Sequence, residues 1–386
     1  MSDLATEVSG FVAAHWRNDM SLRSWWALLA DAGLAKPTWP IGYGGRGLSK
    51  QDANVVGEAL ALAGVISPAM GGVGSGLAAP TILDVGTDSQ IAKYVRAIAD
   101  GTESWVQLWS EPGAGSDLPS LSASAVVDGD EWVISGQKVW NSSADVADRA
   151  MLLARTTPGS TGHAGITYFI LDMHQTGVDV RPLIDMVRES HFNEVFLTDV
   201  RVSTADVLGN VGDGWSVVHT TLGHERKSVT SRGARNAINV QSGGVAGNLD
   251  RTVGELVAMV RNKPAANDRK FALPWRTMLD LARIHGCNSD PVIRQQLVGY
   301  YTMNNLFRWS GQRWHPSITK LWNTQVCQAS RELSLNIVGA NGMLLNEVSN
   351  AALRSPGARI GGGTDEIQRN TLGERALGLP REPSLR

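Results

Sequence analysis

Glycines and hydroxyl side chains stand close together at residues 107–117, in the sequence Gln-Leu-Trp-Ser-Glu-Pro-Gly-Ala-Gly-Ser-Asp. Gly113 and Gly115 have no Cβ, so the backbone there can approach a ligand closely. The hydroxyls of Ser110 and Ser116 can both donate and accept hydrogen bonds. A single segment of this kind is most often a plain surface turn, so a binding role depends on what accompanies it.

Two further segments of similar character occur in the chain. Residues 136–143 read Gly-Gln-Lys-Val-Trp-Asn-Ser-Ser, which places a large aromatic beside small hydroxyl and amide groups. Residues 361–370 read Gly-Gly-Gly-Thr-Asp-Glu-Ile-Gln-Arg-Asn, and Asn336 to Gly342 precede them. Glycine with small polar side chains suits the binding of a polar ligand by backbone groups. The three segments together therefore predict a ligand site.

Other common chemistries lack their sequence signals. The chain contains no phosphate-binding Gly-x-x-x-x-Gly-Lys-Ser/Thr loop and no Gly-x-Ser-x-Gly nucleophile turn. His219 and His224 are five residues apart, which misses a common helix face, and we expect no metal site. The glycines of residues 42–47 lack the preceding strand and the βα unit of a dinucleotide-binding fold.

Composition and charge narrow the class of protein. The 386 residues are 42% hydrophobic and 19% charged, which indicates a globular chain of two or three domains. A formal net charge of −2 gives no basis for binding nucleic acid or an anionic membrane. The uncharged stretch 59–83 contains Pro68 and Pro80, which favour buried segments over a membrane span. Only two cysteines, Cys287 and Cys327, and no visible signal peptide predict a cytoplasmic protein.

The first hundred residues have helical periodicity. In residues 21–33 the apolar side chains fall at helical spacing, Ser21 is a suitable N-cap, and Gly33 a suitable stop. Residues 51–63 and 87–99 are predicted to be further helices.

The periodicity changes near Trp105. Residues 122–127 and 131–135 are predicted to form a hairpin through a type I′ turn at Asp128-Gly129. Four more strands are predicted, with no helix between them, at 150–155, 165–172, 178–182 and 193–202. This order predicts a small antiparallel sheet or barrel rather than βαβ units.

Helical periodicity returns after Gly214. The clearest helix is predicted at 317–338, with Ser317 as its N-cap and Gly339 at its end. We expect one side of it to be apolar, from Ile318 to Ile337. The expected domains are 1–104 (helical), 105–212 (β) and 213–386 (helical bundle).

Taken together, these motifs resemble the acyl-CoA dehydrogenase family over essentially the whole chain. The resemblance also covers residues 37–45, 192–196, 199–202 and 373–380. Five motifs in the right order are a specific signal. The sequence of residues 279–299 is similar to actinobacterial members, many of which oxidise steroid side-chain or fatty thioesters.

The resemblance implies an α+β fold: an N-terminal helical domain, a middle antiparallel β-barrel domain and a C-terminal four-helix bundle. It also implies an FAD bound between the β domain and the bundle, partly by a neighbouring subunit. The residues that match cofactor contacts are Gln107, Ser110, Ser116, Trp140, Ser142, Asn336, Gly339, Ala340, Thr364 and Glu366. Asn336 and Glu366 both stand where Gln is common. The usual arginine at the pyrophosphate has only two candidates, Arg283 and Arg294.

The reaction that the resemblance implies is α,β-dehydrogenation of an acyl thioester. A carboxylate removes the α proton while the β hydride passes to the flavin. Most members carry this carboxylate as a Glu just before the Gly-Thr of the C-terminal turn, a position that is Gly362 here. The resemblance places the alternative base at Glu225, and its neighbour Arg226 at the substrate. The backbone N–H of Gly362 can still polarise the thioester carbonyl.

The sequence leaves two other functions open. One is a flavin monooxygenase or oxidase on the same fold. The other is a catalytically silent subunit of a hetero-oligomer. The expected partners are an acyl-CoA substrate and an electron-transferring flavoprotein or other acceptor, within a homodimer, a homotetramer or a heterotetramer with a related subunit. The acyl chain, and the choice between CoA and a carrier-protein thioester, stay open.

Overall fold

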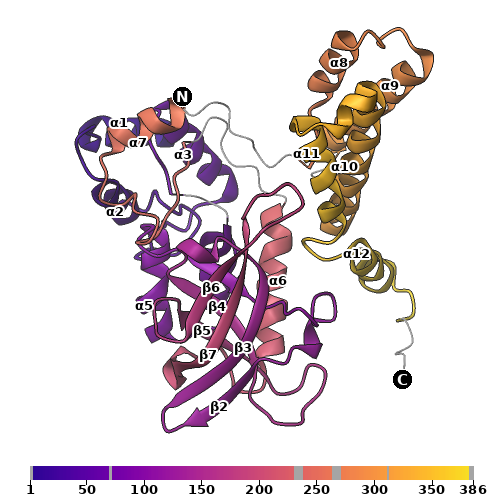
Figure 1. Ribbon diagram of the computed structural model, residues 1–386. Helices are drawn as coiled ribbons and strands as arrows, with labels where there is room; N and C mark the ends of the chain where they lie inside the picture. The colour runs from indigo at the N-terminus through magenta and orange to yellow at the C-terminus, as the bar shows by residue number, and fades with distance from the viewer. Residues whose placement is uncertain (1–2, 69–71, 230–237, 263–270, 311–312, 382–386) are drawn as a thin grey trace. The chain divides into compact units, whose positions relative to one another are not determined.

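The computed structural model describes residues 3–68, 72–229, 238–262, 271–310 and 313–381 (Figure 1). The chain divides into two compact units. The first comprises Met1–Leu183 and Ser190–Pro264, and the second comprises Ile184–Glu189 and Ala265–Arg386. The domain borders expected after residues 104 and 212 stay a prediction.

The first unit begins with a cluster of helices around a tryptophan core. It contains α1 (Asp3–His15), α2 (Leu22–Asp31), α3 (Lys50–Leu62) and α7 (Val253–Asn262), which Figure 1 shows side by side. Trp25 and Trp26 of α2 are fully buried in this core. The Ser21 hydroxyl accepts a hydrogen bond from the Ser24 N–H, so the predicted N-cap is confirmed.

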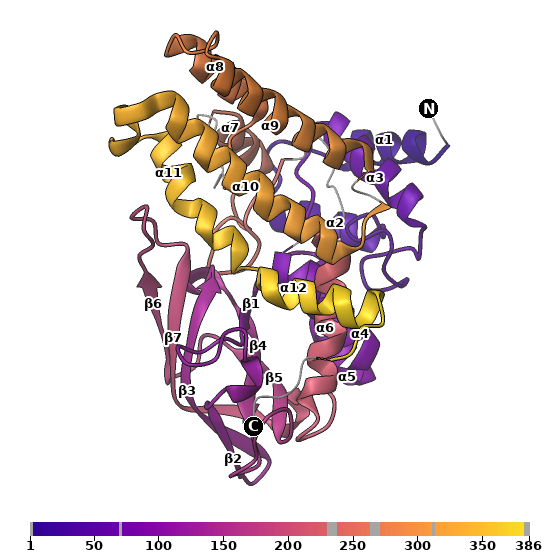
Figure 2. The same cartoon turned by 90° about the vertical axis from the view of Figure 1, so that its right-hand side faces the viewer.

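A second group of helices covers the sheet of the same unit. It contains a short π-helix at Gly74–Ala78, α4 (Ala79–Val85), α5 (Asp88–Ala99) and α6 (Gly214–Val229). Helix α6 packs on α4 and on strand β5 (Ile166–Asp172; Figure 2). A Cβ at Gly214 would lie 2.7 Å from the Tyr168 nitrogen, so only glycine lets α6 begin so close to the sheet.

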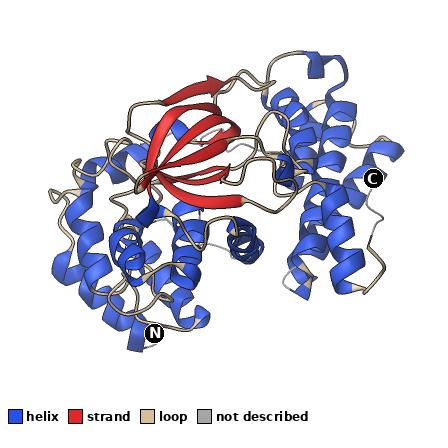
Figure 3. Ribbon diagram, turned by 90° about the horizontal axis from the view of Figure 1, so that it is seen from below, coloured by secondary structure: helices blue, strands red, loops and turns tan. Residues whose placement is uncertain are grey.

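The middle of the unit is one curled seven-stranded sheet (Figure 3). Its other strands are β1 (Trp105–Leu108), β2 (Ser124–Asp128), β3 (Glu131–Ser142), β4 (Arg149–Arg155), β6 (Val178–Leu183) and β7 (Phe192–Ser203). The order is β1-β4-β2-β3-β7-β6, with β5 paired to β4. The predicted strands are confirmed. Strand β1 adds a parallel pairing with β4 to the mainly antiparallel sheet.

The hairpin between β2 and β3 forms, but its predicted turn type is wrong. Asp128 pairs with Glu131, so the central residues are Gly129 and Asp130. Only Gly129 has a positive φ, at 66°. A positive φ at the first central residue alone is the pattern of a type II′ turn, whereas type I′ needs it at both.

The second unit is helical. It contains α8 (Trp275–Ile284), α9 (Pro291–Ser310), α10 (Pro316–Val338), α11 (Glu347–Arg354) and α12 (Asp365–Thr371). The prediction that Ser317 caps α10 is wrong, because Pro316 occupies the first helical position and His315 accepts the Ser317 N–H instead.

The expected apolar side of α10 is only partly present. Ile337 is buried, but Ile318 is 40% exposed, and several buried residues of the helix are small and polar. In the described part of the chain, no helix is long and apolar enough to cross a membrane.

Candidate active site

A buried ion pair holds the loop that follows β1. Lys138 of β3 is 0% exposed and lies 2.8 Å from the Glu111 carboxylate, while it also donates to the Trp109 carbonyl. Glu111 in turn accepts hydrogen bonds from the Ser122 N–H and hydroxyl and from the Ala123 N–H. The pair therefore fixes both ends of the 109–123 loop against β3.

Both members of this pair are charged at neutral pH. Burial alone would raise the pKa of Glu111, but the Lys138 charge and the Ser122 hydrogen bonds hold it below the ordinary value. Burial lowers the pKa of Lys138 to about 8, although Glu111 opposes that change. A buried pair of opposite charges needs several hydrogen bonds to be tolerated, and this one has them.

Trp140 lies on a β-bulge with a strained backbone. Lys138 pairs with Val195 and Asn141 with Asn193, so three steps along β3 match two along β7. The extra residue, Trp140, has φ 64°, a left-handed conformation that costs an ordinary residue about 1–2 kcal/mol. Trp140 is 58% exposed. Strain that exposes a large aromatic is typical of a functional site.

The residues around Trp140 fit the flavin that the resemblance implies. The hydroxyls of Ser110, Ser116 and Ser142 have no hydrogen-bond partner among the described residues, so they are available to a ligand. A Cβ at Gly113 or Gly115 would meet no atom within 4 Å. Neither glycine has the positive φ that would by itself explain the choice of residue.

Gly115→Val is expected to weaken flavin binding without weakening the fold. Because the added side chain enters open space in the protein, the melting temperature should stay within a few degrees of wild type. Crowding of the ligand by roughly 1–3 kcal/mol should lower flavin affinity about tenfold or more. Flavin absorbance after gel filtration measures this. Gly10→Val, also in open space on α1, is the matched control and should keep its flavin.

Helix α6 carries the proposed base. Glu225 is half-buried, and this burial raises the pKa of its carboxyl, while the neighbouring Arg226 acts in the opposite direction. The preceding His224 lies 2.8 Å from Asp84 of α4 and so fixes this end of α6 laterally. A carboxyl with a raised pKa is better matched to proton abstraction near neutral pH.

The C-terminal turn has a glycine, and so no carboxylate, at the position that resembles the usual base. Gly362 has φ 66° and open space around it, and its carbonyl accepts a hydrogen bond from the Gln368 amide. Thr364 caps α12 through the Ile367 N–H. Glu366 lies 3.7 Å from Arg359 and 3.6 Å from Arg369, so its charge is already paired.

A buried polar network anchors this turn to α10. Asp365 accepts hydrogen bonds from Lys320 at 2.7 Å and from Thr324 at 3.0 Å. Asn336 lies 16 residues beyond Lys320 on the same helix, which is about 24 Å along its axis. The structure therefore separates the Gly362 turn from the segment with Asn336, Gly339 and Ala340.

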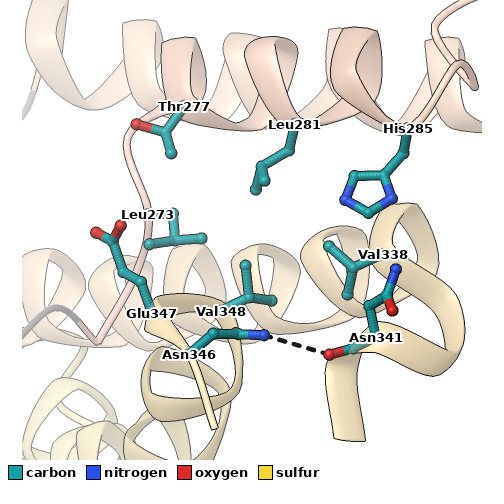
Figure 4. A pocket seen from close by; sticks show the side chains of 9 residues that line it. All are labelled: Leu273, Thr277, Leu281, His285, Val338, Asn341, Asn346, Glu347 and Val348. Atoms are coloured by element: carbon teal, nitrogen blue, oxygen red, sulfur yellow. Dashed lines mark hydrogen bonds between the residues drawn. The ribbon is translucent and has the colours of Figure 1, made fainter. Parts of the chain in front are cut away.

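A cleft of about 230 Å³ adjoins that second segment (Figure 4). Leu281 of α8 and His285, which caps the C-terminus of that helix, face Val338 and Asn341 across it. None of the site residues expected from the sequence lines this cleft.

The predicted site residues thus form separate groups. Gln107, Ser110, Trp140 and Ser142 lie together, because the Asn141 amide donates to the Gln107 carbonyl and the Val139 N–H to the Ser110 carbonyl. Ser116 follows on the 109–123 loop, and Glu225 and Arg226 lie on α6. The remaining six residues belong to the second unit.

Sequence reasoning missed the residues that support the loop. The period of two along β3 puts Lys138 on the same side as Trp132 and Ile134, both buried. A lysine at an inward position requires an acidic partner, and Glu111 lies within the motif already singled out. That signal was present in the sequence.

Three family models match the chain. They are acyl-CoA dehydrogenase N-terminal domain at residues 3–102, acyl-CoA dehydrogenase middle domain at residues 107–200 and acyl-CoA dehydrogenase C-terminal domain at residues 296–377. Acyl-CoA dehydrogenase IpdE1 of Mycobacterium tuberculosis is 34% identical over 93% of this chain and 88% of its own length.

Solved structures share the fold. The Tcur3481-Tcur3483 steroid ACAD superimposes with a TM-score of 0.68 at 25% identity, covering 98% of this chain and 97% of that chain. The ChsE4-ChsE5 complex from Mycobacterium tuberculosis gives a TM-score of 0.64 at 24% identity, covering 99% and 97%. The helical, β and helical order of the sequence is the order of this fold.

Proposed function

This chain belongs to the acyl-CoA dehydrogenase family, and we propose that it oxidises the Cα–Cβ bond of an acyl thioester with Glu225 as base. The observation that carries the proposal is the half-buried position of Glu225 on α6, which raises the pKa of its carboxyl, combined with a glycine at position 362. Glu225 supplies a carboxylate suited to accept a proton. The glycine at position 362 means that no carboxylate stands where most family members carry their base.

The chain's own residues have distinct parts in this proposal. Glu225 accepts the α proton, and Arg226 beside it binds the substrate. Gly362, in the second unit, donates its backbone N–H to the thioester carbonyl and so stabilises charge that develops on the oxygen. A bound FAD would supply the acceptor for the β hydride.

The proposed cofactor contacts follow the groups described above. Trp140 covers the flavin ring. The hydroxyls of Ser110 and Ser142, which have no hydrogen-bond partner among the described residues, bind the polar edge of the ring. Ser116 and the glycines beside it bind the pyrophosphate, where the backbone can approach closely. Gln107 contributes to the same group. Asn336, Gly339 and Ala340 are proposed to contact the cofactor of a neighbouring subunit. Thr364 and Glu366 are proposed to lie in the turn over the adenosine and phosphate part of the cofactor.

Anaerobic mixing of the flavin-loaded protein with acyl-CoAs tests the reaction. Bleaching of the flavin at one equivalent of substrate, with release of the enoyl thioester, supports dehydrogenation. A panel of straight, branched and polycyclic acyl groups identifies the chain type. Rapid reoxidation by air instead of by an electron-transferring flavoprotein would favour the oxidase or monooxygenase function.

The assembly of the protein is a separate part of the proposal. Two solved relatives are described as assemblies of two chains, ChsE4-ChsE5 and Tcur3481-Tcur3483, so a heterotetramer is the state to test first. The chain purified alone should be colourless if a partner completes its flavin site. A yellow, catalytically active homo-oligomer would contradict this state.

The rate of flavin reduction is expected to rise with pH through one inflection that lies above 4.5, the ordinary pKa of a glutamate. Below that inflection Glu225 is protonated and cannot accept the α proton, and burial moves the inflection upward. Stopped-flow reduction at saturating substrate measures the profile. Glu225→Gln should flatten it, and an unchanged inflection in that variant would assign the titration to another group.

A further inference from the structure

The backbone on both sides of Trp140 is tied to the β1 segment. The Val139 N–H donates to the Ser110 carbonyl at 2.9 Å, and the Asn141 side-chain amide donates to the Gln107 carbonyl at 2.8 Å. In the sheet order, β1 and β3 are not hydrogen-bonded neighbours. These two bonds therefore hold the residues that flank the bulge inward and leave Trp140 outside.

Asn193 secures the same segment from β7. It is 1% exposed, and its amide donates to the Asn141 carbonyl at 3.1 Å and to the Asp145 carboxylate at 3.2 Å. Two left-handed residues, Trp140 and Ser143, lie in this stretch. One buried amide thus binds the chain between the two strained residues and again just beyond them.

A strained residue persists only where its surroundings fix it. Trp140 makes an edge-on contact with Phe192 at 5.7 Å between ring centroids, but its indole is largely exposed, so packing alone fixes it weakly. The hydrogen bonds of Asn141 and Asn193 supply the missing constraint. An amide suits the task because it donates two hydrogen bonds without bringing a buried charge.

We propose that Asn141 and Asn193 are positioning residues that hold Trp140 in its left-handed conformation and present the indole to the flavin. The flavin contact rests on the proposed function, whereas the conformational part does not. Their effect on the reaction is indirect, because neither residue is proposed to touch substrate or cofactor.

A second bulge in the same pair of strands provides an internal control. There Asp199 has φ 50°, and the Ser135 hydroxyl accepts its N–H and donates to its carboxylate, both at 3.1 Å. This bulge follows the register shift between Ile134 and Gly136. Ser135→Ala removes a comparable clamp from the same ladder away from Trp140.

Hydrogen exchange of the cofactor-free protein tests the conformational part. Asn193→Ala should speed exchange of the amides at residues 139–143 about tenfold, because local opening becomes easier. Ser135→Ala should leave those amides unchanged and speed exchange near Asp199. Equal exchange at 139–143 in wild type and Asn193→Ala would overturn the proposal, whether or not the protein binds flavin.

A double-mutant cycle with Trp140→Gly separates positioning from general packing. Glycine adopts a positive φ without strain, so the clamp becomes unnecessary in that background. The drop in urea midpoint caused by Asn193→Ala should be at least halved when Trp140 is replaced by glycine. If Asn193→Ala fails to fold alone, the double variant should still fold. The proposal is contradicted if Asn193→Ala lowers the urea midpoint equally in both backgrounds, or if both the single and the double variant misfold.

The flavin-loaded protein gives the second readout. Asn193→Ala is expected to shift the flavin absorption band and to lower flavin affinity about tenfold, while Ser135→Ala should match wild type. If Asn193→Ala speeds hydrogen exchange but leaves flavin binding unaltered, only the proposed link to the cofactor is refuted. A wild-type protein that never binds flavin would instead count against the proposed function.

Discussion

Glu225→Gln is expected to lower the rate of flavin reduction by about 10²–10⁴-fold, the usual contribution of a general base. Glutamine keeps the shape of the side chain but cannot accept the α proton. Flavin content should be unchanged, because Glu225 is proposed to act on the substrate. Single-turnover flavin bleaching under anaerobic conditions measures the loss.

The stability of this variant separates a catalytic loss from a folding defect. Because burial raises the pKa of Glu225, the folded state favours the neutral carboxyl over the charged one. The stabilisation that comes from the neutral form is present at low pH and is lost as the pH rises through the folded pKa. The glutamine side chain of the variant carries no such charge, so the melting temperature at neutral pH should equal or exceed that of wild type.

A matched carboxylate controls for the loss of charge itself. Glu255 on α7 is exposed, and Glu255→Gln should reduce flavin at the wild-type rate. Near-wild-type turnover in Glu225→Gln, with flavin retained, would show that another group removes the α proton.

Lys138→Met is expected to be the most destabilising single change near the candidate site. It leaves the Glu111 carboxylate buried without its cation, and breaking a buried pair in this way costs about 3–5 kcal/mol. The same change releases the 109–123 loop, so flavin affinity should fall as well. Urea unfolding of the cofactor-free protein measures the first effect, and flavin titration the second.

Two further variants test the cause. Lys138→Met combined with Glu111→Gln removes the stranded charge yet keeps an acceptor for Ser122, so part of the lost free energy of unfolding should return. Lys93→Met breaks a pair with Asp206 in which the lysine side chain is 53% exposed and the aspartate side chain 18% exposed. Because water screens the lysine charge, the change should cost at most about 1 kcal/mol. If Lys138→Met and Lys93→Met lower the free energy of unfolding equally, burial of the Lys138–Glu111 pair does not make it more important for stability.

Local sequence patterns predicted helices and strands well where neighbouring residues alone determine the structure. The N-cap at Ser21 and the β2–β3 hairpin depend on neighbouring residues, and both are present. The N-cap of α10 was misassigned because Pro316 can begin a helix and moves the cap to His315. The turn type was wrong because strand register, a property of two strands together, decides which residues are central.

The supporting residues of the site required partners that lie far apart in the chain. Lys138 and Glu111 are 27 residues apart, and Asn193 and Asn141 are 52 apart. The period of two points Lys138 inward and so indicates an acidic partner, but only the folded chain shows which carboxylate meets it. For Asn193 and Asn141 no local pattern distinguishes a clamp from an ordinary polar residue.

The order of helical and β parts, the family, and the identities of the candidate base and flavin loop can all be read from the amino-acid sequence. The order of the parts follows from periodicity, whereas the candidate base and the flavin loop follow from the resemblance of contiguous motifs to the family. The folded chain was needed to learn that Trp140 is strained and exposed, that Glu225 is buried enough to raise its pKa, and that a buried ion pair fixes the loop. Strain, desolvation and ion pairing are set by atoms brought together in folding rather than by neighbours along the chain.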